Sequence, residues 1–304
     1  MELLMRNMFQ ALGKNRSANK WAKKYGLKFG AGRFVAGESI EKAIVVVKEL
    51  NREGRVATLD HLGEFVFTME EANESASMCI QTLDAMAQAG VQSNLSLKMT
   101  SLGLDISKEL CISNMRRILD RGKTHGNFVR IDMEDYEHCQ VSLDIYQELR
   151  RDYDNVGLVI QAYLYRTEQD MKDLNEVKAN LRLVKGAYKE SPEVAYPEKA
   201  VVDENYKKII RVHLLNGNYT AVASHDESII EYTKNLVREN NISKDQFEFQ
   251  MLYGICVDLQ KRLVEEGYKV RVYVPYGVDW FGYFMRRLAE RPANVWFVLK
   301  NLFK

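Results

Sequence analysis

Two cations lie within a short apolar run near the middle of the chain. In "NLRLVKGAYKE", residues 180–190, three apolar residues predict a buried strand, and Arg182 and Lys185 interrupt it. A buried cation needs a partner that stabilises its charge, or else it loses its proton. The stretch therefore predicts a site for a substrate that forms a Schiff base, for a phosphate or for a flavin.

Short apolar runs that end in polar residues recur along the whole chain. Segments with helical spacing of apolar residues, such as "NMRRILDRG", separate them, and this alternation predicts a parallel sheet. Eight such units favour a (βα)8 barrel. An open doubly wound sheet would carry a G-x-G-x-x-G turn after its first strand, and "LDHLGEF" is not one. The runs begin at Arg55, Ser93, Asn127, Val156, Asn180, Thr220, Phe247 and Lys269.

The barrel is predicted to belong to a single domain that spans residues 1–304, because no linker rich in Pro, Gly or Ser divides the chain. Residues 1–50 are predicted to form an N-terminal helical segment that packs on the barrel formed by residues 51–304. Within this segment, "SIEKAIVVVKELNREG" predicts a helix with Ser39 as its N-cap and Gly54 just past its end.

In such a barrel, catalytic groups lie at the C-terminal ends of the strands. Each polar residue there also has an ordinary structural explanation, since a lysine is usually solvated and Asp132 could cap the next helix. Many such residues on one barrel mouth nevertheless predict a functional site. The residues at the predicted strand ends are Asp60, His61, Lys98, Asp132, Gln161, Arg182, Lys185, His225, Gln250 and Tyr273.

The segment after the eighth predicted strand, "YGVDWFGYFMRRLAERPANVWF", predicts a helix that Asp279 can cap. Arg286, Arg287 and Glu290 lie within one turn of this helix and can share one patch. A solvated, salt-bridged helix face is the ordinary explanation of such a pattern. Because aromatic residues leave the helix little polar face, we favour two guanidiniums that bind a carboxylate through paired hydrogen bonds.

The composition argues against several other classes of protein. With 304 residues, 28% of them charged, and a formal net charge of +1, the chain has no basic stripe for nucleic acid. The four cysteines lack C-x-x-C spacing, which favours free thiols, and no H-x-H or H-E-x-x-H motif indicates a metal site. The start "MELLMRNMFQ" is unlike a signal peptide, and "AIVVV" is too short to cross a bilayer. We therefore expect a cytoplasmic protein without a required metal.

An ordered set of motifs resembles the proline dehydrogenase family, in particular its short bacterial monofunctional type. The motifs are "LSLKMTSLG", "VRIDMED", "VIQAYLYRT", "LRLVKGAY", "ASHD", "FEFQMLYG", "YVPYG" and "YFMRRLAERP". The resemblance implies a distorted (βα)8 TIM barrel with extra N-terminal helices and a C-terminal helix over the barrel mouth. It implies non-covalently bound FAD and the oxidation of L-proline to Δ1-pyrroline-5-carboxylate by hydride transfer from C5, the first step of proline degradation to glutamate.

The resemblance also implies partners for the reaction. Electrons would pass from the reduced flavin to a membrane quinone, with peripheral contact at the inner face of the membrane. A chain of this type lacks the aldehyde dehydrogenase half of some bacterial relatives, so functional coupling to a separate aldehyde dehydrogenase is expected.

Roles for individual residues follow from the same resemblance. The catalytic residues would be Asp132 and Arg182, and Glu64 in "HLGEF" would be a gate that pairs with an active-site arginine. Ser224 stands where the family has threonine and keeps the hydroxyl. The substrate-binding residues would be Lys98, Tyr188, Leu252, Tyr273, Arg286, Arg287 and Glu290. The cofactor-binding residues would be Met133, Gln161, Arg182, Lys185, Gly186, Ala187, Ser224 and His225.

Two alternatives to this function keep the barrel. A Schiff-base aldolase would use Lys185 or Lys98 as its nucleophile. A non-catalytic amino-acid-binding barrel would keep the carboxylate-binding arginines and bind no flavin.

Overall fold

The computed structural model describes residues 31–63 and 66–290 of the chain, with the side chains of 32–63 and 66–285. Glu64, most of the predicted N-terminal segment and the side chains of Arg286, Arg287 and Glu290 lie outside this description. The single domain over residues 1–304 therefore stays a prediction.

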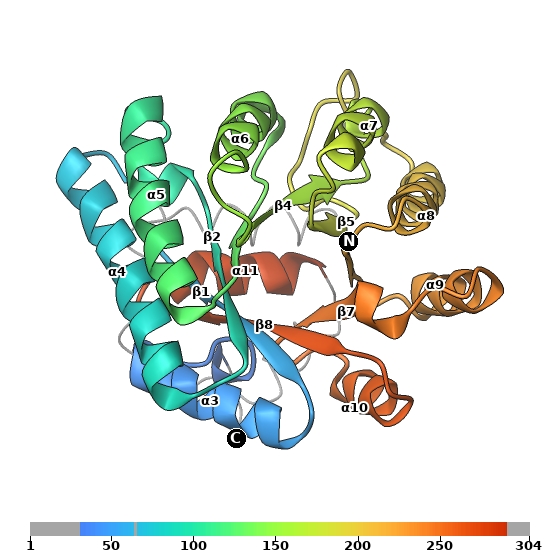
Figure 1. Cartoon of the computed structure of the whole chain (residues 1–304), viewed down its shortest axis with the longest axis horizontal. Coiled ribbons are helices and arrows are strands. Elements are labelled where there is room, and N and C mark those ends of the chain that lie inside the picture. Colours follow the sequence, from blue (N-terminus) through green and yellow to red (C-terminus); the bar gives the residue numbers. More distant parts are fainter. Residues whose placement is uncertain (1–30, 64–65, 291–304) are drawn as a thin grey trace.

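Eight parallel strands, hydrogen-bonded in sequence order, close into a barrel (Figure 1). Each strand lies within one of the eight predicted runs, so the predicted (βα)8 barrel is confirmed. The strands are β1 (Val56–His61), β2 (Ser93–Leu97), β3 (Val129–Ile131), β4 (Val156–Gln161), β5 (Leu181–Val184), β6 (Thr220–Ala223), β7 (Phe247–Leu252) and β8 (Val270–Tyr276).

Each of the first seven strands is followed by a helix that covers the outside of the barrel. The helix ends show ordinary sequence signals: Thr68 and Glu71 form a capping box at the start of the first of these helices, and Gly90 ends it in the left-handed conformation. The helices are α4 (Met69–Ala89), α5 (Lys108–His125), α6 (Tyr136–Leu149), α7 (Thr167–Glu176), α8 (Lys199–Leu215), α9 (Glu227–Glu239) and α10 (Val257–Glu265), with short 3₁₀ turns η2 (Ala31–Arg33), η3 (Thr100–Leu102) and η4 (Lys244–Gln246).

The remaining two helices lie in different places. The helix α3 (Ile40–Arg52) packs on β1, β8 and α4, where the last helix of a regular barrel would lie. It begins after Ser39 and ends before Gly54 as predicted, although the Ser39 side chain makes no capping hydrogen bond. Ala43, Val47 and other apolar residues of one face are buried.

The helix α11 (Trp280–Glu290) follows β8 and crosses the centre of the barrel in Figure 1. Its described residues form a small apolar cluster with Phe34, Val35, Leu62 and Ile255. Leu62 directly follows β1, and Ile255 lies in the loop after β7. The helix therefore covers the C-terminal ends of the strands, and this confirms the predicted helix over the barrel mouth.

The inside of the barrel is polar, whereas bulky branched residues dominate the inside of most such barrels. In-register partners on neighbouring strands point to the same face, so the pairs Asp60↔Ser96 and Ser96↔Arg130 put polar groups side by side. The pair Gln250↔Arg271 does the same on β7 and β8. Side chains that point to the inside of the barrel thus form a network of buried charged and polar groups.

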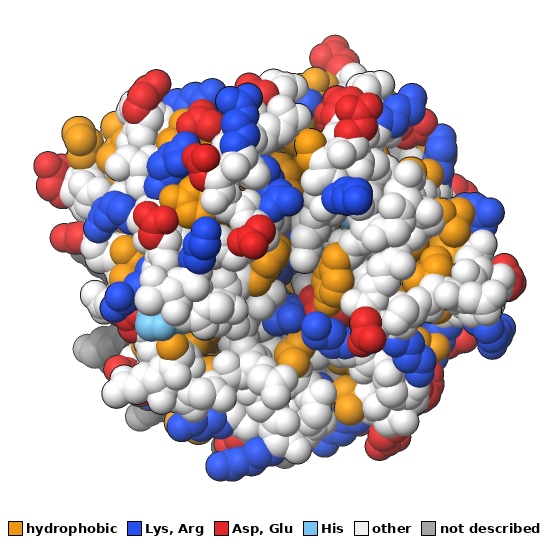
Figure 2. Space-filling view, in the orientation of Figure 1, with side chains coloured by type: hydrophobic (Ala, Val, Ile, Leu, Met, Phe, Trp, Pro, Cys, Tyr) orange, Lys and Arg blue, Asp and Glu red, His pale blue; other side chains and the backbone are white. Residues whose placement is uncertain are grey.

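The outer surface is mixed in charge. Figure 2 shows basic and acidic side chains interspersed over one face of the molecule, in keeping with the formal net charge of +1. No helix within residues 31–63 and 66–290 is long and apolar enough to cross a membrane.

A histidine joins two loops of the barrel mouth and gives a test of this arrangement. His138 lies 2.5 Å from Asp135 through Nδ1 and 2.8 Å from Asp105 through Nε2. Burial opposes a charge on the ring, but hydrogen bonds to Asp105 and Asp135 outweigh it and raise the pKa of His138 to about 9.

We expect this interaction to stabilise the fold fully below about pH 6.5, the ordinary pKa of histidine, and to be lost as the pH rises through about 9. Urea unfolding of the wild type and of His138→Gln across this range measures the effect. The variant should lose the pH dependence that the wild type shows there. Parallel profiles for the two proteins would contradict the assignment.

Candidate active site

Arg182 is a cation held inside the barrel as the second residue of β5, and only 5% of it is exposed. Its Nη1 donates to Asp132 Oδ1 at 2.6 Å, its Nε to Gln250 Oε1 at 2.5 Å and its Nη2 to Ser96 Oγ at 3.0 Å. A guanidinium has five N–H donors. Among the described residues, two of them are therefore left for an incoming group, one on each terminal nitrogen.

A tyrosine hydroxyl joins two carboxyl groups next to this cation. The hydroxyl of Tyr273 lies 2.6 Å from Asp60 Oδ2 and 2.8 Å from Asp132 Oδ2. Burial and then the two carboxylates raise the pKa of Tyr273 well above its ordinary value, so the phenol keeps its hydrogen. Because one O–H carries one hydrogen, both contacts are hydrogen bonds only if one carboxyl is protonated.

Of the two carboxyl groups, Asp60 is better placed than Asp132 to carry that second proton. It is 2% exposed, and its burial raises its pKa, an effect that the ammonium of Lys98 at 3.4 Å opposes. Asp132 instead faces the guanidinium of Arg182. The mouth thus holds one carboxylate paired with a cation and one carboxyl poised to bind or release a proton.

Lys185 points to the outside of the barrel mouth and is held by two carboxylates. Its Nζ lies 2.5 Å from Asp203 Oδ1 and 2.9 Å from Asp226 Oδ2. Burial opposes ionisation of Asp226, but hydrogen bonds from Lys185 and Ser228 lower the pKa of Asp226 to about 2. Lys185 is therefore positioned as a cation and not as the neutral amine that forms a Schiff base.

The predicted pair on the sixth strand lies directly beyond β6. Ser224 Oγ accepts from the Asp226 backbone N–H at 3.1 Å, and His225 Nε2 accepts from the Leu252 backbone N–H at 3.0 Å. Since Nε2 is an acceptor, the hydrogen of the neutral ring is on Nδ1. Leu252, at the end of β7, is half-buried and packs against the apolar cluster under α11.

The predicted residues Met133, in the loop after β3, and Gln161, the last residue of β4, are 7% and 3% exposed. Gln161 Nε2 donates to the Glu134 carbonyl at 2.9 Å, which fixes its amide at the mouth. Glu134 in turn accepts from the Thr100 hydroxyl at 2.6 Å. These contacts tie the loops after β2, β3 and β4 together.

The packing of the chain itself also requires a glycine at position 186. Its φ is +122°, and a Cβ at this position would clash with the Tyr163 ring. A role of Gly186 in binding the cofactor stays a prediction. Ala187 and Tyr188 follow in the same loop and are exposed, Tyr188 by 36%.

Ser96, Glu248 and Arg271 complete the buried network and were not predicted as site residues. Asp60 and Gln250 were predicted at strand ends, without an assigned role. The alternation of polar and apolar residues in "FEFQML" and "VRVYVP" is the signal that could have found Glu248 and Arg271.

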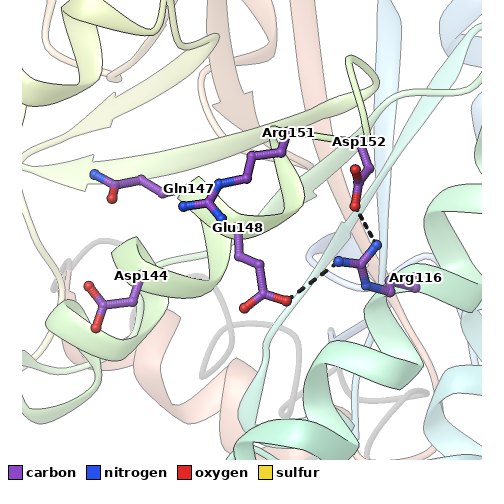
Figure 3. Close-up of a pocket in the computed structure, with 6 residues that line it drawn as sticks. All are labelled: Arg116, Asp144, Gln147, Glu148, Arg151 and Asp152. Carbon is purple, nitrogen blue, oxygen red and sulfur yellow. Dashed lines mark hydrogen bonds and ion pairs between the residues drawn. The ribbon is translucent and has the colours of Figure 1, made fainter.

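A separate pocket of about 490 Å³ lies on the outer surface at α5 and at the end of α6 (Figure 3). Arg116 there is paired with Asp152 at 2.6 Å and with Glu148 at 3.4 Å. None of its lining residues is buried, and it lies away from the strand ends that carry the network. We therefore assign the active site to the barrel mouth. No cluster of three or more potential metal ligands occurs among the residues that the structure describes.

The fold and this site define a class of protein: a (βα)8-barrel enzyme whose mouth holds a buried cation, paired carboxyls and a covering helix. A family model described as "Proline dehydrogenase" matches residues 43–300. The chain therefore belongs to the proline dehydrogenase family. It is an enzyme of proline oxidation, the first step of proline catabolism, and the family implies a flavin cofactor.

Individual relatives agree with this membership. The chain is 52% identical to "Proline dehydrogenase 1" of Bacillus subtilis subsp. natto, over 99% of this chain and 100% of the relative. It is 47% identical to "Proline dehydrogenase" of Deinococcus radiodurans, over 90% of each chain. The crystal structure of proline utilization A (PutA) from Bdellovibrio bacteriovorus, inactivated by N-propargylglycine, superposes with a TM-score of 0.81 at 30% identity. That match covers 86% of this chain and 32% of the PutA chain.

The two carboxyls beside Tyr273 should respond differently to the same substitution. Asp132→Asn removes the charge opposite Arg182 and should lower the free energy of unfolding by about 3–5 kcal/mol, because it leaves a buried cation unpaired. Asp60→Asn resembles the protonated acid and should change it by less than about 1 kcal/mol. Urea unfolding at pH 7 compares them, and equal losses would contradict the placement of the proton on Asp60.

Proposed function

We propose that this chain binds FAD without a covalent bond at the barrel mouth and oxidises L-proline to Δ1-pyrroline-5-carboxylate. The observation that carries the proposal is the environment of Arg182. It is a buried cation on β5, its contacts with the described residues leave two N–H groups for an incoming partner, and the chain belongs to the proline dehydrogenase family.

The residues at the mouth fit a flavin by their chemistry. Bound FAD would supply the acceptor for the hydride of proline C5. A cation near the ring stabilises the negative charge of a reduced flavin and raises its reduction potential. Around Arg182, a set of apolar, amide and hydroxyl groups and a second cation can hold the rest of the cofactor. The residues proposed for this are Met133, Gln161, Arg182, Lys185, Gly186, Ala187, Ser224 and His225.

The substrate carboxylate would be bound by Lys98, Arg286 and Arg287. Lys98 lies at the end of β2 with a side chain that is 20% exposed, and the backbone of α11 carries the two arginines across the mouth. The remaining substrate residues would be Tyr188, Leu252, Tyr273 and Glu290, of which the first three can wall an apolar ring. Glu64 remains proposed as the gate.

The proline nitrogen must be neutral before a hydride can leave C5. Asp132 is the group that can take this proton, because Tyr273 and Asp60, which short contacts join to it, already hold theirs. We assign Asp132 and Arg182 as the catalytic residues of the chain. The protein otherwise contributes orientation, carboxylate binding and electrostatics.

Electrons would leave through a membrane quinone. Large exposed apolar side chains on loops at the mouth support an apolar acceptor: Phe67 is 66% exposed and Val278 is 49% exposed. The proposal therefore includes a cytoplasmic location with peripheral contact at the inner face of the membrane. The product would be consumed by a separate aldehyde dehydrogenase.

The Schiff-base aldolase is disfavoured by the two carboxylates that hold Lys185. A non-catalytic binding barrel would not require a buried guanidinium that is held by three hydrogen bonds. Two measurements separate these functions. Borohydride with substrate traps an aldolase only, and product formation from L-proline deuterated at C5 should show a primary isotope effect only in a dehydrogenase. Absence of the product would contradict the proposal.

Arg182→Met should leave FAD bound but lower its reduction potential and slow the reductive half-reaction. Loss of one well-placed electrostatic contact costs about 3 kcal/mol, or a hundredfold or more in rate. Arg130→Met is the matched control, because Arg130 is buried inside the same barrel but bonds to Asn180 and the Leu158 carbonyl. Equal changes in the two variants, in redox titration and stopped flow, would remove Arg182 from the catalytic residues.

Arg286→Met and Arg287→Met should each raise KM for proline by one to two orders of magnitude. Each removes charge-assisted hydrogen bonds of about 1.5–3 kcal/mol. FAD content should stay near that of the wild type. Pyrrolidine, which lacks the carboxylate, should be a poor substrate that loses almost nothing further in the variants. Wild-type KM in both would show that the arginines only form surface salt bridges.

A further inference from the structure

A second ion pair lies inside the barrel, further from the mouth than the contact between Arg182 and Gln250. Glu248 on β7 and Arg271 on β8 are 1% and 7% exposed. Arg271 Nε donates to Glu248 Oε1 at 2.7 Å and its Nη2 to Glu248 Oε2 at 3.1 Å, and such paired hydrogen bonds give strong and directional pairs. Burial opposes ionisation of Glu248, but Arg271 outweighs it and lowers the pKa of Glu248 to about 2.

Gln250 joins this ion pair to the active site. Its Nε2 donates to Glu248 Oε1 at 2.5 Å, and its Oε1 accepts from Arg182 Nε at 2.5 Å. An ionised carboxylate can only accept and a guanidinium can only donate. The amide therefore has one allowed orientation, with its nitrogen toward Glu248 and its oxygen toward Arg182.

Without the carboxylate of Glu248, the contact with Arg182 alone would hold the amide of Gln250, and the amide could turn over more easily. Its NH2 group would then face Arg182 Nε, donor against donor, and that N–H would lose its acceptor. Asp132 and Ser96 would hold only the two terminal nitrogens. The plane of the guanidinium would no longer be fixed from three sides, and a site held loosely by its supporting residues loses catalytic power.

We propose that Glu248 is a positioning residue for the reaction, which acts through Gln250 to fix the guanidinium of Arg182 and the two N–H groups that remain for the cofactor. The inference rests on the proposed function, because that function makes the direction of these N–H groups matter. Glu248 itself reaches neither substrate nor cofactor from its place below the mouth.

A double-mutant cycle tests this route. Glu248→Leu/Arg271→Met removes the buried pair as a unit, which proteins often tolerate in stability, and Gln250→Met removes the link. We expect each to slow reduction of the flavin by proline about tenfold. Their midpoint potentials should fall by about 30 mV if the equilibrium constant for this two-electron couple also changes tenfold. Combining all three substitutions should add less than twofold to Gln250→Met, whereas additive effects would overturn the route through Gln250.

Tyr219→Phe is the matched control for a merely structural role. The Tyr219 hydroxyl donates to Glu248 Oε2 at 2.8 Å, on the side away from Gln250. This variant should lose stability and keep the wild-type rate and midpoint potential. If it instead shifts both as much as Glu248→Leu/Arg271→Met does, the effect is one of packing, and the proposal is overturned.

The cofactor-free protein gives a readout that does not depend on the proposed function. Exchange of the Arg182 Nε hydrogen with water, followed by NMR on ¹⁵N-arginine protein, should be at least tenfold faster in Glu248→Leu/Arg271→Met than in wild type. Should that variant not fold, Glu248→Asp keeps the charge opposite Arg271 and withdraws it from Gln250, with the same expected direction. Unchanged exchange overturns the inference alone, whereas a wild type that binds no flavin overturns the proposed function.

Discussion

The structure depends on the burial of one guanidinium in the middle of a barrel. Arg182 sits on β5 with 5% of its surface exposed, where an unpaired charge would be strongly destabilising. Asp132, Gln250 and Ser96 each take one of its nitrogens. These three partners stabilise the cation without using all of its N–H groups. The N–H groups that they leave are what makes the site useful for chemistry.

Holding that cation imposes a constraint on the rest of the barrel interior. The partners of Arg182 need partners of their own, so the polar network extends to Tyr273 and Asp60 toward the mouth and to Glu248 below it. Such a network is stable only when its members are satisfied. The barrel thereby gives up the apolar interior of the usual fold, and its apolar core lies instead between the strands and the outer helices.

The place of α11 follows from the same need. A charged mouth that worked in open water would lose much of its electrostatic strength, since charges interact more strongly away from solvent. The helix that follows β8 crosses the mouth through an apolar cluster that includes Trp280 and Phe284. The outer position next to β8 is filled by α3, which comes from the other end of the chain.

Much of this arrangement can be predicted from the sequence. The strands were predictable because apolar runs alternate with helical segments, and these runs carry Asp132, Arg182 and Tyr273 in order. The pairing of Lys185 with Asp203 and Asp226 was not, because it joins residues of three loops and helices whose relative placement no local pattern encodes. Gly186 shows the same limit of prediction from sequence. A glycine permits the positive φ, but the contact with Tyr163 depends on the packing of two loops.

The most direct test of the account is the visible spectrum of the FAD-loaded protein during anaerobic addition of L-proline. The account predicts that proline removes the absorbance of the oxidised flavin and that pyrrolidine at the same concentration does so far more slowly. A protein that takes up no FAD, or one that binds FAD whose spectrum does not respond to proline, would contradict it.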